Sequence, residues 1–154
     1  MKYLFESIES QVRLKAILDS WLDPPTPYRH RCGVKGLGCD CIHFVAKTLV
    51  ELGILKWKKD LIPDYARDWH MHDTRELLKE HIERRLYGQW IPLLNFENGD
   101  ILLFHFGKAA SHAGIYFDGY VYQAIDDIGV KKISADDHFF RKHMKFNYRI
   151  GVRE

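Results

Sequence analysis

One stretch constrains the fold more than any other: residues 36–45, in which small residues lead directly into an amphipathic helix. Asp40 stands where a helix N-cap belongs, and Gly53 stands where a glycine commonly follows a helix C-terminus. The sequence therefore predicts a helix that begins at Cys41 and buries one face. The apolar residues at helical spacing are Phe44, Val45, Leu49 and Leu52.

This prediction places the Cys41 side chain in the first turn of a helix. Backbone N–H groups without partners and the positive end of the helix dipole favour a thiolate there, so we expect a lowered pKa. A thiolate beside backbone donors is what nucleophilic catalysis requires. The alternative is a small buried apolar side chain with no chemical role.

Two further helices are predicted on either side of this one. Residues 8–22 carry apolar residues at helical spacing and end at Asp23-Pro24-Pro25, because proline cannot continue a helix. Residues 73–76 (Asp-Thr-Arg-Glu) have the composition of a capping box, which predicts a helix that ends at Gly88. Residues 54–72 lack a clean period, and we expect a loop with one helical turn.

After residue 99 the pattern changes to short segments typical of β-strands. The Asp118-Gly119 pair is typical of a two-residue hairpin turn with a positive φ at the glycine. Helices followed by consecutive antiparallel strands predict an α+β fold, and the length of 154 residues favours a single domain over residues 1–154. The predicted strands cover residues 100–106, 111–117, 120–125, 129–134 and 146–152.

The hairpin turn also predicts the register of the two strands that it joins. If the residues flanking the turn face each other, Gly114 faces Gln123 and His112 faces Ile125. His112 and Gln123 then lie on one face as diagonal neighbours. An amide oxygen can accept from one imidazole N–H and leave the other nitrogen as a base. Together with Cys41, these residues would supply a nucleophile, a base and an orienting group.

Charge and apolar content argue against several classes of protein. The net charge of +2 is too small to favour nucleic-acid binding, and no apolar run is long enough to span a membrane. The N-terminus reaches Glu6 before any apolar region forms, so we expect no signal peptide and synthesis in the cytoplasm.

The three cysteines lie within ten positions, which predicts free thiols from a reducing compartment. His30, Cys32, Cys39 and Cys41 could in principle hold zinc in an interaction module. Their His-x-Cys and Cys-x-Cys spacings differ from those of structural zinc sites, and His70-x-His72 is a weaker signal still. We therefore expect no metal and no cofactor.

Four motifs occur in a recognisable order: Pro27-Tyr28, Asp40-Cys41, residues 99–104 (Gly-Asp-Ile-Leu-Leu-Phe) and residues 111–116 (Ser-His-Ala-Gly-Ile-Tyr). Together they resemble the NlpC-type cell-wall peptidases, which are papain-like cysteine peptidases. The approach to the cysteine, and the segment over residues 63–69, are similar to the branch encoded by phages and gene transfer agents. The resemblance extends from about residue 21 to 149. It implies helices packed on a five- to six-stranded antiparallel sheet.

The resemblance also implies an activity. The family substrate is the peptidoglycan stem peptide, most often cut between γ-D-glutamate and the diamino acid. Phage tail proteins would be further partners, and the protein would act on the cell wall as a phage or prophage component. Catalytic roles are implied for Cys41, His112 and Gln123, and oxyanion or substrate-binding roles are implied for Tyr28, Asp40 and Ser111.

One departure from the family pattern keeps alternatives open. Ile42-His43 replaces the usual Ser-Gly after the cysteine, and this bulk would reshape the substrate subsites. An inactive tail-tip protein with the same fold is one alternative. An acyltransferase or amidase of the same superfamily is another, although the permuted acyltransferases carry their histidine upstream of the cysteine.

Overall fold

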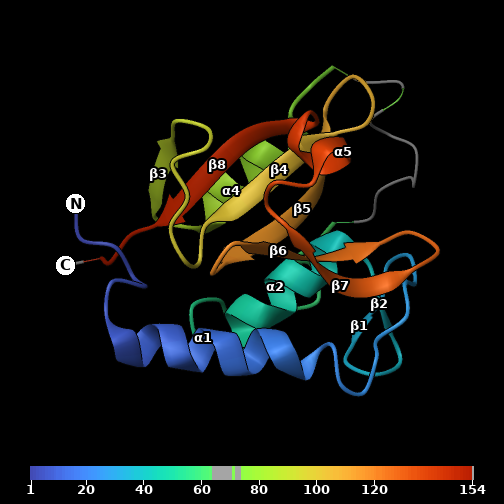
Figure 1. Ribbon diagram of the computed structural model, residues 1–154, viewed down its shortest axis with the longest axis horizontal. Helices are drawn as coiled ribbons and strands as arrows, with labels where there is room; N and C mark the ends of the chain where they lie inside the picture. Colours follow the sequence, from blue (N-terminus) through green and yellow to red (C-terminus); the bar gives the residue numbers. More distant parts are fainter. Residues whose placement is uncertain (64–70, 72–73, 154) are drawn as a thin grey trace.

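A six-stranded antiparallel sheet forms the centre of the fold in the computed structural model, which describes residues 1–63, 71 and 74–153 (Figure 1). The strand order is β3-β8-β4-β5-β6-β7, so β4, β5 and β6 are neighbours both in sequence and in the sheet. The α+β prediction is confirmed. The strands are β3 (Gly88–Ile91), β4 (Ile101–His105), β5 (Ala110–Phe117), β6 (Tyr120–Ile125), β7 (Gly129–Ser134) and β8 (Met144–Ile150).

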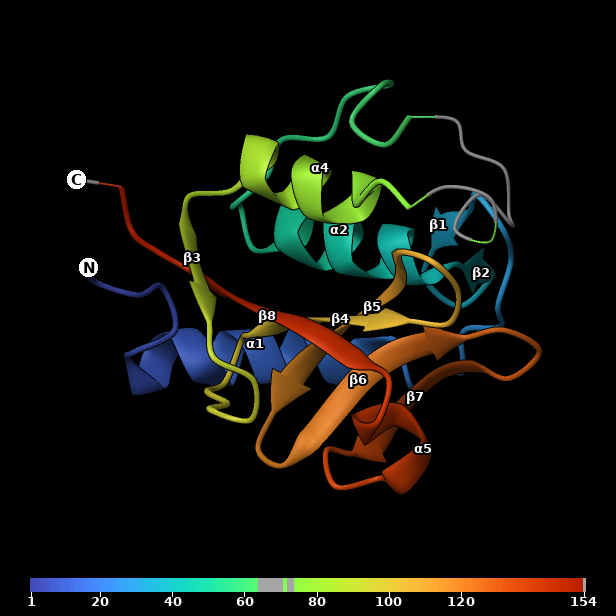
Figure 2. The same cartoon turned by 90° about the horizontal axis from the view of Figure 1, so that it is seen from above.

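Helices lie on both faces of this sheet (Figure 2). On one face, α2 (Cys41–Glu51) packs against β5 and β6, and α4 (Leu77–Arg85) lies beside it against β5. The first helix, α1 (Ile8–Ser20), packs against α2, whereas the short α5 (His138–Arg141) lies on the opposite face. Among the described residues, no helix has the length and apolar character needed to cross a bilayer.

The core is divided between the two faces because side chains alternate along the strands. Ile101 and Leu103 point toward α2 and α4 in the larger apolar cluster. Leu102 and Phe104 point the other way and pack with Phe140 of α5. The sheet therefore separates a helical layer from a smaller aromatic layer.

The helix predicted over residues 8–22 is confirmed as α1, although it ends at Ser20. Leu14 and Leu18 are buried, and the Trp21 ring just beyond the helix packs edge-on against Phe44 of α2 at 5.4 Å. This contact fixes α1 against the helix that carries Cys41.

The capping-box prediction for the next helix is wrong. The helix begins at Leu77, and the Glu76 carboxylate accepts from the Ala110 backbone N–H (3.1 Å) and pairs with Lys145 (2.6 Å). The Glu76 side chain, which was predicted to cap the helix, thus binds residues of β5 and β8 instead. Asp73, the first residue of the predicted box, lies outside the described residues.

Several short elements were not predicted. Gly88 opens β3 rather than only ending a helix, and a Cβ there would lie 2.2 Å from the Arg149 carbonyl oxygen. The pair β1 (Gly33–Val34) and β2 (Gly38–Cys39) forms a small separate sheet just before α2, and α5 was also missed. Residues 54–63 form the expected loop, and the rest of the loop prediction, apart from Met71, lies outside the described residues.

The hairpin between β5 and β6 has the predicted register. Both turn residues have positive φ, +50° at Asp118 and +88° at Gly119, and Gly114 pairs with Gln123. Pairing ends at that point, so the expected pair of His112 with Ile125 does not form. The two strands therefore separate before His112 is reached, and His112 has no partner residue on β6.

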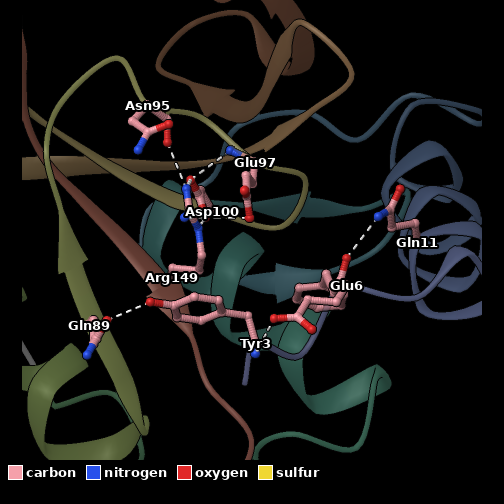
Figure 3. Close-up of polar contacts among 9 residues, drawn as sticks. Tyr3, Glu6, Gln11, Gln89, Asn95, Glu97, Asp100 and Arg149 are labelled. Carbon is pink, nitrogen blue, oxygen red and sulfur yellow. Dashed lines mark hydrogen bonds and ion pairs between the residues drawn. The ribbon is translucent and has the colours of Figure 1, made fainter. Parts of the chain in front are cut away.

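A buried ion pair connects the start of β4 to β8 (Figure 3). Arg149 donates to both carboxylate oxygens of Asp100 at 2.9 Å and to the Asn95 carbonyl at 2.7 Å. The Glu97 backbone N–H donates to the same carboxylate at 3.0 Å, and the Arg149 guanidinium lies 5.4 Å from the Tyr3 ring centre. The pair therefore fixes the N-terminal segment and the loop before β4 to the sheet.

Candidate active site

Cys41 occupies the first position of α2, as the sequence predicts. The Asp40 carboxylate caps the helix: Oδ1 accepts from the His43 backbone N–H (2.8 Å), and Oδ2 accepts from the Arg31 backbone N–H (2.7 Å). Such a cap typically contributes about 1 kcal/mol. Asp40 is 1% exposed, so both the helix start and the loop before it are fixed around a buried carboxylate.

The segment that carries Tyr28 runs beside the strand that leads into Cys41. The Arg29 N–H donates to the Cys39 carbonyl and the Cys39 N–H donates to the Pro27 carbonyl, both at 3.0 Å. Tyr28 pairs with Cys39 and packs, half-buried, against the larger apolar cluster. The predicted oxyanion residue is therefore held near the start of α2, while its catalytic role stays a prediction.

The Cys41 thiol lies against the edge of β5, beyond the last pair of β5 and β6. It donates to the Ser111 carbonyl, with an Sγ–O distance of 3.6 Å, and it accepts from the Ala113 backbone N–H. Backbone groups of alternate residues point to the same side of a strand. The thiol thus contacts the backbone on both sides of His112, and Ser111 takes part through its carbonyl.

The protonation state of Cys41 differs from the prediction. Burial, followed by the negative charge of Asp40, raises the pKa of the thiol to about 12. Nearby backbone N–H groups lower the pKa by less. The predicted low pKa is wrong because desolvation of the thiolate outweighs the helix terminus. The resting thiol is neutral and needs a base.

His112 and Gln123 form a hydrogen-bonded pair on the face predicted for them. His112 Nε2 lies 2.7 Å from Gln123 Oε1, and Gln123 is fully buried. Since an amide oxygen only accepts, Nε2 carries the proton and Nδ1 is the basic nitrogen. Burial lowers the pKa of His112 to about 4, although the Gln123 hydrogen bond opposes this. The imidazole is therefore neutral and able to accept a proton near pH 7.

Ile42 and His43, the two residues that depart from the family pattern, point in different directions. The His43 Nδ1 atom lies 2.8 Å from Asp40 Oδ1, the carboxylate that caps α2. Ile42 lines an apolar cavity of about 150 Å³ between α2 and α4. His43 therefore reinforces the helix cap and Ile42 enters the helical layer. A substrate-binding role for Asp40 stays a prediction.

A polar groove lies beside Tyr28, between residues 27–30 and 126–128. Arg29 lines one side of it, and Asp126 and Asp127 line the other. Side chains of both signs suit a ligand that carries both carboxylate and amine groups. Sequence reasoning missed this groove, because nothing in the local pattern after β6 indicates that the turn comes back to Tyr28.

The described part of the chain contains no group of three or more His, Cys, Asp or Glu side chains placed to hold a metal ion. Cys32, Cys39 and Cys41 are all free. His70 and His72 lie outside the described residues.

Comparisons with known proteins connect this fold to one family. Residues 25–149 match the NlpC/P60 family. A crystal structure from Staphylococcus aureus subsp. aureus Mu50, of a protein similar to lipoprotein in the NLP/P60 family, gives a TM-score of 0.65 at 16% identity. It covers 98% of this chain, which spans only 44% of that protein.

A second crystal structure, of the NlpC/p60 domain of the peptidoglycan hydrolase SagA, gives a TM-score of 0.59 at 16% identity. The match covers 92% of this chain and 98% of that domain. At this identity the two structures show a shared fold. The comparison with curated proteins found no match.

Proposed function

Because the chain belongs to the NlpC/P60 family, we propose that it is a cell-wall cysteine peptidase that hydrolyses amide bonds in peptidoglycan stem peptides. The observation that carries this proposal is the contact of the Cys41 thiol with the backbone on both sides of His112, whose ring is hydrogen-bonded to Gln123. This arrangement supplies a nucleophile, a base and an orienting group. The likeness to the SagA domain, part of a peptidoglycan hydrolase, supports the substrate class.

In the proposed reaction, the proton of the Cys41 thiol moves to Nδ1 of His112 as sulfur attacks the scissile carbonyl carbon. Gln123 accepts from Nε2–H throughout and so stabilises the imidazolium that forms. When the tetrahedral intermediate collapses, the C–N bond breaks and His112 returns the proton to the leaving amine. A water molecule then attacks the thioester carbonyl and gives a proton to His112. The C–S bond breaks, His112 returns the proton to the Cys41 sulfur, and the acid product leaves.

The negative charge on the carbonyl oxygen needs hydrogen-bond donors in the transition state. The Cys41 backbone N–H belongs to the first turn of α2, where backbone donors have no carbonyl of the helix to bind. The Tyr28 hydroxyl is the second proposed donor; the backbone pairing of Tyr28 with Cys39, two residues before Cys41, supports this choice.

The cleaved bond in our proposal joins γ-D-glutamate to the diamino acid, whose carboxylate and amine groups suit the mixed charges beside Tyr28. We further propose a phage or prophage setting, with tail proteins as partners. The motifs over residues 26–41 and 63–69 support it through their similarity to the phage branch.

Digestion of purified peptidoglycan tests the activity, with fragments identified by mass. We expect new amine termini on the diamino acid from the wild-type protein and none from Cys41→Ala. Cys32→Ala is the matched control: Cys32 is a partly exposed free cysteine on the loop that leads toward α2, and its replacement should leave the activity unchanged.

Digestion by Cys41→Ala at the wild-type rate would refute the assignment of the nucleophile. Intact peptidoglycan after incubation with folded wild-type protein would favour the alternative of an inactive protein with the same fold. Fragments cut at a different amide would retain the peptidase and correct only the bond.

A further inference from the structure

Three aromatic rings surround His112 on the face of the sheet opposite α2. The ring centres of Phe104, Phe106 and Phe140 lie 5.5, 5.8 and 6.0 Å from that of the imidazole. Phe140 alone among these three is close to parallel with it, at an interplanar angle of 27°. The ring of Phe140 therefore lies roughly parallel to the imidazole, at the separation of a packed aromatic pair.

The short helix α5 holds this phenylalanine in place from several directions. The Asp137 carboxylate accepts from the Phe140 backbone N–H at 3.1 Å, and the Phe140 carbonyl accepts from the His143 N–H at 3.0 Å. Next to it, Arg141 Nε donates to the Ala135 carbonyl at 3.1 Å. The Phe140 ring also packs edge-on against Phe104, at 5.9 Å. Its position is thus set by α5 and β4 together.

The His112–Gln123 hydrogen bond depends on one orientation of the imidazole. Rotation of the ring about its bond to Cβ would move Nε2 away from Gln123, and water would compete for both partners. Packing of aromatic rings around the imidazole opposes such rotation. We propose that Phe140 is a positioning residue, which holds the His112 ring against Gln123 and keeps water away from their hydrogen bond.

The lowered pKa of His112 gives this role a measurable signature. Burial is the largest cause of the shift and the Gln123 hydrogen bond opposes it, so water admitted at Phe140 should raise the pKa toward 6.5. Other ionisable groups on the surrounding elements are Cys41 on α2, His105 on β4, Lys108 after β4, Lys131 on β7, Arg141 on α5 and His143 before β8. The substitutions below leave all of them in place.

Nuclear magnetic resonance of the ¹⁵N-labelled imidazole measures this pKa in the full chain without any substrate. For Phe140→Ala we expect a rise of about one unit or more. Phe140→Tyr keeps the stacked ring and should stay close to the wild-type value. Phe139→Ala is the matched control: Phe139 is 52% exposed on the same helix and packs on Phe106 and His143.

Two results would overturn the proposal. The first is a folded Phe140→Ala protein in which His112 titrates as in the wild type, which would make Phe140 a packing residue only. The second is an equal shift in Phe139→Ala, which would assign the effect to α5 as a whole. A second measurement rests on the proposed function: in Phe140→Ala, the acid limb of the pH profile of kcat/KM should shift by the same amount as the pKa of His112. An inactive wild-type protein would overturn the proposed function and leave the titration result standing.

Discussion

Acidification of the assay tests the protonation state of the proposed base. Burial lowers the pKa of His112 to about 4, whereas an ordinary imidazole titrates at 6.5. His112 acts as a base only in its neutral form, so activity should persist well below pH 6. The thiol of Cys41 stays protonated over the same range, because its pKa is raised to about 12. The acid limb therefore reports His112 rather than the nucleophile.

The size of the effect follows from these two values. At pH 5, a histidine with a pKa of about 4 is roughly 90% neutral, whereas one with a pKa of 6.5 is about 3% neutral. We therefore expect kcat/KM at pH 5 to be about 90% of its plateau value. An unperturbed base would give a value roughly thirty-fold lower.

The assay is hydrolysis of a soluble stem peptide at low concentration between pH 3.5 and 8. Circular dichroism at each pH serves as the control, because the unfolded chain binds a proton at His112 below about pH 6.5 and the folded chain does so only near pH 4. Stability is therefore lost as the pH falls through this window. An acid limb centred near 6.5 in fully folded protein would refute the buried, neutral imidazole.

Three substitutions test other parts of the structure. Gln123→Ala should lower kcat by less than His112→Ala, because the amide orients the ring without transferring a proton; equal losses in folded variants would contradict this ranking. Tyr28→Phe should lower kcat on the order of 10²-fold, about 3 kcal/mol, and change KM much less, and near wild-type turnover on a stem peptide would leave Tyr28 with packing alone. Arg149→Met should cost about 3–5 kcal/mol in urea unfolding, because Asp100 stays buried without its partner. A loss under about 1 kcal/mol would contradict the last argument.

The parts of the fold that could be predicted are those fixed by local chemistry. The Asp118-Gly119 turn admits few registers, so the pair of Gly114 with Gln123 follows from the sequence, and with it the meeting of His112 and Gln123. The start of α2 is similarly fixed by one side chain, the Asp40 cap. In both cases the partners lie close together in the sequence.

The parts that could not be predicted depend on contacts between distant segments. Glu76 leaves the predicted capping box because Lys145, 69 residues further along, binds its carboxylate. The pKa of Cys41 depends on how deeply β5 buries the thiol, which a helix start alone does not reveal. The ring of Phe140 reaches His112 only because α5 folds back over the sheet. Sequence periodicity contains no information of this kind.

The candidate site is assembled across the sheet rather than on one face of it. The helical layer delivers Cys41 to the edge of β5, and the opposite, aromatic layer encloses His112. Burial on both sides favours the uncharged form of each group, which separates the pKa of the thiol, about 12, from that of the imidazole, about 4. A proton transferred between them creates two charges that the free site disfavours. In the proposed reaction the substrate shares this cost. The charge on sulfur passes to the carbonyl oxygen as the bond forms, and the proposed donors at the start of α2 then stabilise that oxygen.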